Sequence, residues 1–149
     1  MYMPVVDGKY ETCLSTYFKS TDNGVDEIKR KLGKARKVRI SNVPRSLVDE
    51  LRPLLSGKDV KIVLAEGEKP DAGLRSLGDV AVTKARITAD YKGVEAYEGS
   101  VTFADRVFNV IWTAEGVKEI TSMNYRKCAL CLNETFETAW HYADKSADR

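Results

Sequence analysis

The sequence predicts an α/β fold, in which a mixed sheet has a parallel βαβ section and further antiparallel strands, with helices packed on the sheet faces. Residues 37–41 and 59–65 alternate apolar and polar side chains, and an apolar stripe of helical period separates them. Two strands joined by one helix make a right-handed parallel βαβ unit. From residue 79 onward, short alternating segments are divided by turn residues, which indicates antiparallel hairpins.

The composition limits the classes of protein that the sequence can encode. The chain has 149 residues, 43% of them hydrophobic and 31% charged, with a formal net charge of +2. We expect a single domain over residues 1–149, with a polar tail, 144–149, that frays. The composition excludes disorder, and we expect no signal peptide, no membrane partner and no cofactor. Three cysteines, an odd number, favour a cytoplasmic protein with reduced thiols.

The helices before and inside the βαβ unit have recognisable ends. Residues 21–24 predict a loop that caps a helix ending at Gly33. The helix of the βαβ unit has Pro44 in its first turn and ends at 56–57, and Pro53 is expected to kink or shorten it. Each helix has one apolar face, which we expect to pack on the sheet.

A polar loop, 66–78, follows the second parallel strand. Ligands of open α/β sheets usually bind at this carboxyl edge. Glu66, Glu68 and Asp71 are therefore candidates for binding a sugar hydroxyl or a cation. The simpler interpretation, which we prefer, is a solvated loop.

A basic run lies between residues 29 and 39, with seven Lys or Arg residues and no acid. Such a run can follow a phosphate backbone, and Lys31, Arg36 and Lys37 are its nucleic-acid candidates. Alternatively, the cations complement the dipole at a helix C-terminus and flank the entry to a strand. No aromatic residue interleaves with the run, so we prefer the second interpretation and do not expect nucleic acid as a partner.

The last helical pattern, 124–143, carries a wide apolar stripe that includes Cys128 and Cys131. A C-x-x-C at a helix start favours thiolate chemistry, and this is the sharpest chemical signal in the sequence. Both sulfurs fall on the apolar stripe, however, where Cys packs as a small hydrophobe. Packing is the preferred interpretation, and a redox pair or a metal site remains open, with Cys13 as a further soft ligand.

The order of elements from 25 to 143 resembles one half of a phospholipase D-like domain. The segment 133–140, NETFETAW, is similar to the close of the effector domain of TrmB-type archaeal transcription regulators. The resemblance implies the α/β fold above and a homodimer. Those regulators carry an N-terminal DNA-binding helix-turn-helix, and we expect none in these 149 residues.

Phospholipase D-type enzymes use an H-x-K-x4-D motif, whose histidine is the nucleophile. The segment that best matches the motif, 82–100, has Val82 in place of the histidine. It retains Lys84, an Asp90 that comes one residue late, and the pair Gly99-Ser100. A covalent phosphohistidine route is therefore closed, and Lys84 and Asp90 stay as ligand-binding candidates.

The sequence leaves the question of enzymatic activity open, with more weight against it. We expect a non-catalytic, phospholipase D-like module for ligand sensing or protein interaction. The alternative function is a thiol redox or metal-binding protein that uses Cys128 and Cys131.

Overall fold

A computed structural model of the chain describes the backbone of residues 5–6, 9–10, 15–17, 21–64, 68–83, 88–103, 106–123 and 126–145. Side chains are described in 22–64, 68–83, 88, 90–103, 106–123 and 134–145. Three of the candidate residues, Cys13, Glu66 and Lys84, lie outside the described residues. Cys128 and Cys131 are described only as helix backbone.

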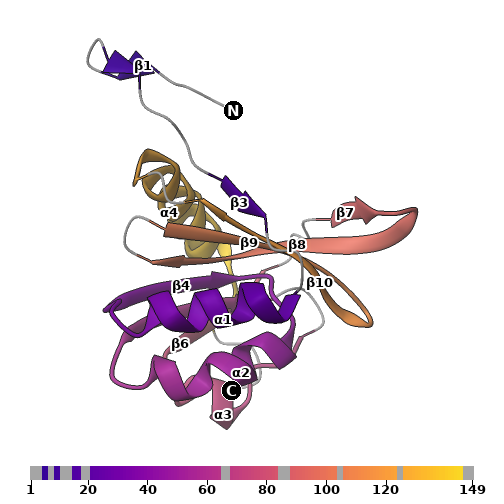
Figure 1. Cartoon of the computed structure of the whole chain (residues 1–149). Helices are drawn as coiled ribbons and strands as arrows, with labels where there is room; N and C mark the ends of the chain where they lie inside the picture. Colours follow the sequence, from indigo (N-terminus) through magenta and orange to yellow (C-terminus); the bar gives the residue numbers. More distant parts are fainter. Residues whose placement is uncertain are drawn as a thin grey trace.

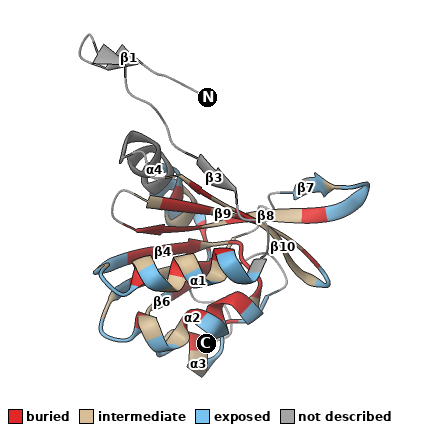
Figure 2. Cartoon of the chain, viewed as in Figure 1, coloured by how far each residue is buried: buried red, intermediate tan, exposed pale blue. Residues whose placement is uncertain are grey.

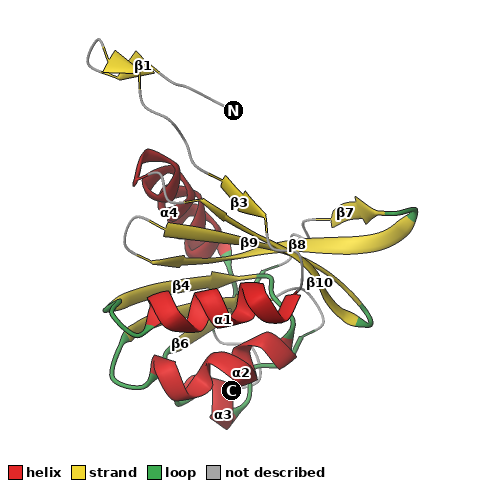
Figure 3. Cartoon of the chain, in the orientation of Figure 1, coloured by secondary structure: helices red, strands yellow, loops and turns green. Residues whose placement is uncertain are grey.

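The described elements confirm an α/β fold with a mixed sheet (Figures 1 and 3). The strands are β1 (Val5–Val6), β2 (Lys9–Tyr10), β3 (Ser15–Tyr17), β4 (Lys37–Ser41), β5 (Asp59–Leu64), β6 (Asp79–Val82), β7 (Thr88–Tyr91), β8 (Val94–Phe103), β9 (Arg106–Thr113) and β10 (Gly116–Met123). The helices are α1 (Thr21–Leu32), α2 (Arg45–Leu55), α3 (Ala72–Arg75) and α4 (Arg126–Tyr142).

The strands of the main sheet lie in the order β3-β10-β9-β8-β4-β5-β6, with β7 paired to β8. The pairs β4-β5 and β5-β6 are parallel, and β4-β8, β8-β9, β9-β10 and β10-β3 are antiparallel. The predicted βαβ unit is therefore β4-α2-β5. The hairpins predicted beyond residue 79 form the antiparallel half of the sheet from β7 onward, whereas the first of the segments predicted there, β6, pairs in parallel with β5 and corrects that part of the prediction.

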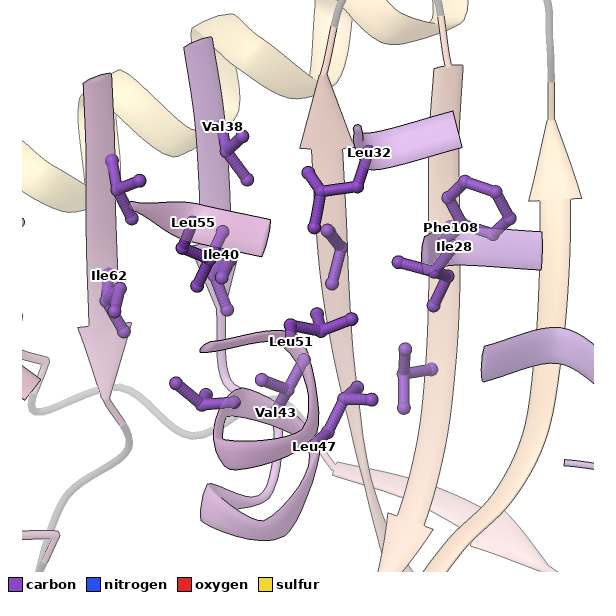
Figure 4. Close-up of a cluster of buried hydrophobic side chains, with 14 of the residues drawn as sticks. Ile28, Leu32, Val38, Ile40, Val43, Leu47, Leu51, Leu55, Ile62 and Phe108 are labelled. Carbon is purple, nitrogen blue, oxygen red and sulfur yellow. The ribbon is translucent and has the colours of Figure 1, made fainter. Parts of the chain in front are cut away.

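Helices cover both faces of the sheet, with α1 and α2 on one face and α4 on the other (Figure 1). The main core lies under α1 and α2, where buried side chains are concentrated (Figure 2). Figure 4 shows this packing, in which Ile28 and Leu51 of the helices meet strand residues such as Ile40 and Phe108. Val38 and Ile40, the apolar positions in the alternating segment 37–41, are both fully buried.

Three local expectations differ from the structure. Residues 21–24 are the first turn of α1 and not a preceding loop. Gly24 explains the difference, because a Cβ there would lie 2.8 Å from the Cβ of Ile120 on β10, so its missing side chain lets α1 pack closely on the sheet. Helix α2 continues through Pro53 to Leu55, and the loop after β5 contains the short helix α3.

The chain just after α4 is tied to the sheet. The backbone N–H of Asp144 donates to the carbonyl of Val82 at 2.8 Å, and Val82 donates back to Asp144 at 2.9 Å. The expected fraying at 144 is thus replaced by a bridge to β6, and residues 146–149 lie outside the described residues. This bridge holds the end of α4 against the edge strand.

Candidate functional site

The face of the parallel strands on the side of α4 carries charged side chains beside the buried Val63 and Ala81, unlike the apolar face under α1 and α2. In the register of the sheet, Arg39 of β4 pairs with Lys61 of β5, which pairs with Asp79 of β6. Arg39 is only 4% exposed, which is unusual for a charged side chain. A charged residue in a strand is usually interpreted as solvent-exposed, so the sequence alone did not identify Arg39 as buried.

The guanidinium of Arg39 is held by acids from two elements. It donates to both carboxylate oxygens of Asp59 at 3.3 Å, and to the main-chain oxygen of Asp59 at 3.0 Å. Its Nε lies 3.6 Å from Oε1 of Glu137 on α4, whose Oε2 lies 3.8 Å from the ammonium of Lys61. Hydrogen bonds from Arg39 lower the pKa of Asp59. Glu137 therefore joins α4 to two cations on the sheet.

Some cations of the basic run form salt bridges, and others do not. Lys29 pairs with Glu50 at 3.0 Å, and Arg30 pairs with Glu27 at 2.7 Å. Further along, Lys34, Arg36 and Lys37 are exposed and Lys31 is half-buried. None of these four forms an ion pair with an acid among the described side chains. They follow the last turn of α1 into the start of β4.

The loop before β5 extends this basic surface. The N–H of Asp59 donates to the carbonyl of Arg36 at 2.8 Å, and the ammonium of Lys58 donates to the carbonyl of Ala35. We call the cations gathered here the α1–β4 edge: Lys31, Lys34, Arg36, Lys37 and Lys58. The structure thus brings Lys31, Arg36 and Lys37 together on one edge, and it adds Lys34 and Lys58.

The ligand-binding candidates that the structure describes have local contacts of their own. Asp71 caps α3 by accepting from the N–H of Leu74 at 2.9 Å, and it pairs with Arg45 at 2.9 Å. Arg45 and, after it, the N–H of Leu74 lower the pKa of Asp71. Asp90 accepts from the N–H of Gly93 at 3.1 Å in the β7–β8 turn.

Glu68, the remaining described acid of this set, is exposed. No contact among the described side chains joins Glu68, Asp71 and Asp90 into one cluster. Their proposed role in binding a ligand stays a prediction.

A hollow of about 270 Å³ lies between α4 and strands β4, β8 and β9. It is lined by Ser41, Glu98, Gly99, Ser100, Asn109, Thr135, Phe136 and Ala139. The Gly99-Ser100 pair noted in the sequence therefore faces a cavity. A Cβ on Gly99 would lie 2.1 Å from the carbonyl oxygen of Asn42, so only glycine fits where β8 lies beside the residue that follows β4.

No nucleophilic histidine stands where the phospholipase D motif requires one. Val82 occupies that position, and its backbone forms two hydrogen bonds with the backbone of Asp144. His141, the one histidine of the sequence, is exposed on α4, where its ring packs edge-on against Tyr142 at 5.0 Å. Within the described side chains, no three His, Cys, Asp or Glu residues are grouped to hold a metal ion. None of the described helices is long and apolar enough to cross a membrane.

Comparison with known proteins gives structural likeness without sequence likeness. No protein-family profile matches this sequence, and no curated protein matches it significantly. Several solved structures share the fold, and three of them are described here. NucT from Helicobacter pylori has 12% identity and a TM-score of 0.65, over 90% of this chain and 99% of that one. Nuc from Salmonella typhimurium, described as a phospholipase D family member, has 12% identity and a TM-score of 0.58, over 92% and 99%.

The third structure is TrmBL2, described as an archaeal chromatin protein with a novel mode of DNA binding. It has 13% identity and a TM-score of 0.61 over 88% of this chain, which spans about half (54%) of the TrmBL2 chain. These likenesses confirm a phospholipase D-like fold that resembles TrmB-type domains. The expectation that nucleic acid is not a partner was wrong, because a protein of this fold is described as binding DNA.

Proposed function

We propose that this chain is a phospholipase D-like domain that binds the phosphate backbone of nucleic acid and does not cut it through a histidine nucleophile. The observation that carries the proposal is the α1–β4 edge, where Lys34, Arg36 and Lys37 are exposed and form no salt bridge with an acid among the described side chains. Exposed cations of this kind neutralise phosphates and release counterions. TrmBL2, which has the same fold, is described as binding DNA.

The geometry of the edge favours backbone contacts over base reading. Its cations come from a helix end and two strand-entry loops, and the backbone bond from Asp59 to Arg36 holds these loops together. No described element projects from this edge as a recognition helix for the major groove. The proposal therefore predicts binding with little dependence on base sequence and a strong dependence on salt.

The test is fluorescence anisotropy with a labelled duplex of mixed sequence, measured from about 50 to 200 mM salt. The variant Lys34→Gln/Arg36→Gln/Lys37→Gln is expected to reduce the slope of log K against log salt by about 2 to 3, because each lost phosphate contact removes about 0.9. The matched control, Lys69→Gln/Lys92→Gln/Lys118→Gln, removes the same charge elsewhere and should retain the slope. The duplex should stay intact in gel analysis.

Two results would overturn the proposal. One is the absence of binding by the wild-type chain at about 50 mM salt. The other is an equal loss of affinity in the two triple variants, which would mean that total charge decides binding and the α1–β4 edge does not. Circular dichroism of each variant separates a loss of binding from a loss of folding.

A second candidate function, the sensing of a small neutral ligand, is supported by the hollow beside α4. Its polar wall includes Ser41, Ser100 and an Asn109 side chain that donates to Glu98 at 2.8 Å. A thermal-shift screen of sugars tests this function: a shift that Ser100→Val abolishes supports it, and a shift retained in that variant opposes it. Redox or metal chemistry at Cys128 and Cys131, a cytoplasmic location and a homodimer all stay predictions.

A further inference from the structure

The hollow between α4 and strands β4, β8 and β9 has a polar wall, which the sheet supplies. In the register of the sheet, Ser41 of β4 lies opposite Ser100 of β8, and Ser100 lies opposite Asn109 of β9. Glu98 precedes Ser100 by two residues on β8, so both lie on the same face of the sheet. All four side chains line the hollow. The sheet therefore presents two hydroxyls, an amide and a carboxylate to one cavity.

The carboxylate of Glu98 is the charge of this cavity, since no other described residue that lines it is charged. Its Oε1 accepts from the amide of Asn109 at 2.8 Å. Glu98 forms no salt bridge with a cation among the described side chains. Its Oε2 and the hydroxyls of Ser41 and Ser100 have no hydrogen-bond partner among the described residues. Three acceptors therefore face the hollow and are open to a donor.

The cations on the strands that frame the hollow are used elsewhere or lie away from it. Arg39 of β4 is held by Asp59 and by Glu137 of α4. Lys37 is the first residue of β4, at the other end of the strand from the hollow. Arg106 of β9 falls on the opposite face of the sheet, because successive side chains of a strand alternate between the faces. Among the described cations of these strands, none compensates the carboxylate in the hollow.

The described charges on all four framing elements also leave a negative surrounding. On α4, β4, β8 and β9 the described acids exceed the cations by one. The β5 residues that contact Arg39 and Glu137, namely Asp59 and Lys61, cancel each other. The acids in question are Glu95, Glu98, Glu134 and Glu137, and the cations are Lys37, Arg39 and Arg106. The hollow therefore favours a cation over an anion.

Helix α4 closes the hollow with an apolar wall. Phe136, which is buried, and Ala139 line it from this helix. A bare metal ion would leave this wall without contact, and within the described side chains no three His, Cys, Asp or Glu residues are grouped to hold one. The volume of about 270 Å³ is near the lower limit for ligand sites, about 300 Å³, so the occupant is small.

We propose that this hollow binds a small primary alkylammonium ion, whose nitrogen donates to Glu98, Ser41 and Ser100 while its alkyl chain lies against the α4 wall. A primary ammonium has three N–H donors, which match the three acceptors. Its hydrogen bond to a carboxylate is charge-assisted and about twice as strong as that of an alcohol. This role goes beyond nucleic-acid binding. It gives the hollow a cationic ligand in place of the neutral one of the second candidate function.

The test is a titration of the full 149-residue chain with n-butylammonium at constant ionic strength, followed by ¹H–¹⁵N NMR. We expect a dissociation constant of about 1 to 10 mM, with the amide signals of Gly99, Ser100 and Asn109 among those that shift. 1-Butanol, which has the chain without the charge, and ammonium chloride, which has the charge without the chain, should each bind at least about tenfold more weakly.

Four results of this titration would overturn the proposal. The first is no binding of n-butylammonium at about 50 mM, and the second is a set of shifted signals that excludes the residues of the hollow. The third is equal binding by 1-butanol or by ammonium chloride, which would mean that the charge or the apolar wall plays no part. The fourth is glucose binding in the hollow more tightly than n-butylammonium, which would support the neutral ligand. None of these results requires a variant that folds.

Two variants assign the binding to individual side chains. Glu98→Gln keeps an acceptor for Asn109 and removes the charge, so n-butylammonium should bind about tenfold more weakly while 1-butanol is unaffected. Glu95→Gln is the matched control, because it removes the same charge from the exposed, opposite face of β8 and should change neither. Ala139→Leu fills the hollow and should weaken both ligands. Unchanged binding in Glu98→Gln or Ala139→Leu, or equal weakening in Glu95→Gln, would overturn the proposal.

The two binding proposals can fail separately. The triple variant at the α1–β4 edge should bind n-butylammonium like the wild type, and Glu98→Gln should bind the labelled duplex like the wild type. Loss of n-butylammonium binding in the triple variant would place the ligand at the α1–β4 edge and overturn the inference. Loss of duplex binding alone would leave the alkylammonium site unaffected.

Discussion

The buried guanidinium of Arg39 leads to a quantitative expectation about stability. Arg39 is 4% exposed, while the side chains of its acidic partners Asp59 and Glu137 are 64% and 46% exposed. Changing either partner alone, as Asp59→Asn or Glu137→Gln, should lower the free energy of unfolding by about 1 kcal/mol, because one acid remains and exposed carboxylates are screened. The double variant leaves the buried charge without a counterion, which costs about 3 to 5 kcal/mol.

Thermal and urea unfolding followed by circular dichroism at neutral pH measure this difference. For a domain of this size, 1 kcal/mol shifts the melting temperature by about 2 to 4 °C, so the double variant should melt about 6 to 20 °C below the wild type. The single variants should melt only a few degrees lower. The excess of the double variant over the sum of the singles is the energetic signature of an unpaired buried charge.

A third substitution provides the control. Arg39→Met in the background of Asp59→Asn/Glu137→Gln removes the buried charge and keeps most of the apolar volume, so it should recover most of the lost stability. If the double variant costs no more than the sum of the singles, or if Arg39→Met leaves it equally unstable, the reasoning is refuted. The destabilisation would then come from lost local contacts and not from an uncompensated charge.

Two further predictions concern the pH dependence of stability and the close approach of Gly99 to Asn42. Hydrogen bonds from Arg39 lower the pKa of Asp59 in the folded chain. Near and below about pH 4, Asp59 therefore binds a proton more readily in the unfolded chain than in the folded one. The stabilisation from Asp59 is present above that pH and is lost as the pH falls through the folded-state pKa. Urea midpoints from about pH 6 to 2 should therefore fall less steeply in Asp59→Asn, and an unchanged slope would contradict this. Gly99→Ala places a Cβ 2.1 Å from the carbonyl oxygen of Asn42 and should cost about 1 to 3 kcal/mol or more in thermal unfolding. Gly33→Ala, whose Cβ meets no atom within 4 Å, is its control. Equal melting temperatures of the two variants would contradict the close approach of Gly99 to Asn42.

Local patterns in the sequence were sufficient for most of the architecture. The strands β4 and β5, the helix between them and the antiparallel hairpins follow from side-chain periodicity, which depends on neighbouring residues alone. The lack of a nucleophile at Val82 was equally readable. The first turn of α1 was missed because Gly24 looks like a loop residue, and only the approach of Ile120 from β10 explains a glycine inside that helix.

The sequence by itself determined most of the helices and strands and the apolar face of each helix. It also showed that the motif position at Val82 lacks a histidine. Only the tertiary structure decided that Arg39 is buried and that Lys61 and Lys145 lie beside Trp140. It also showed which cations of the basic run form salt bridges. The physical reason is that periodicity shows which side of an element is apolar but does not show which distant element will cover the other side. Charges brought together from β5 and α4 have no signature in the order of residues.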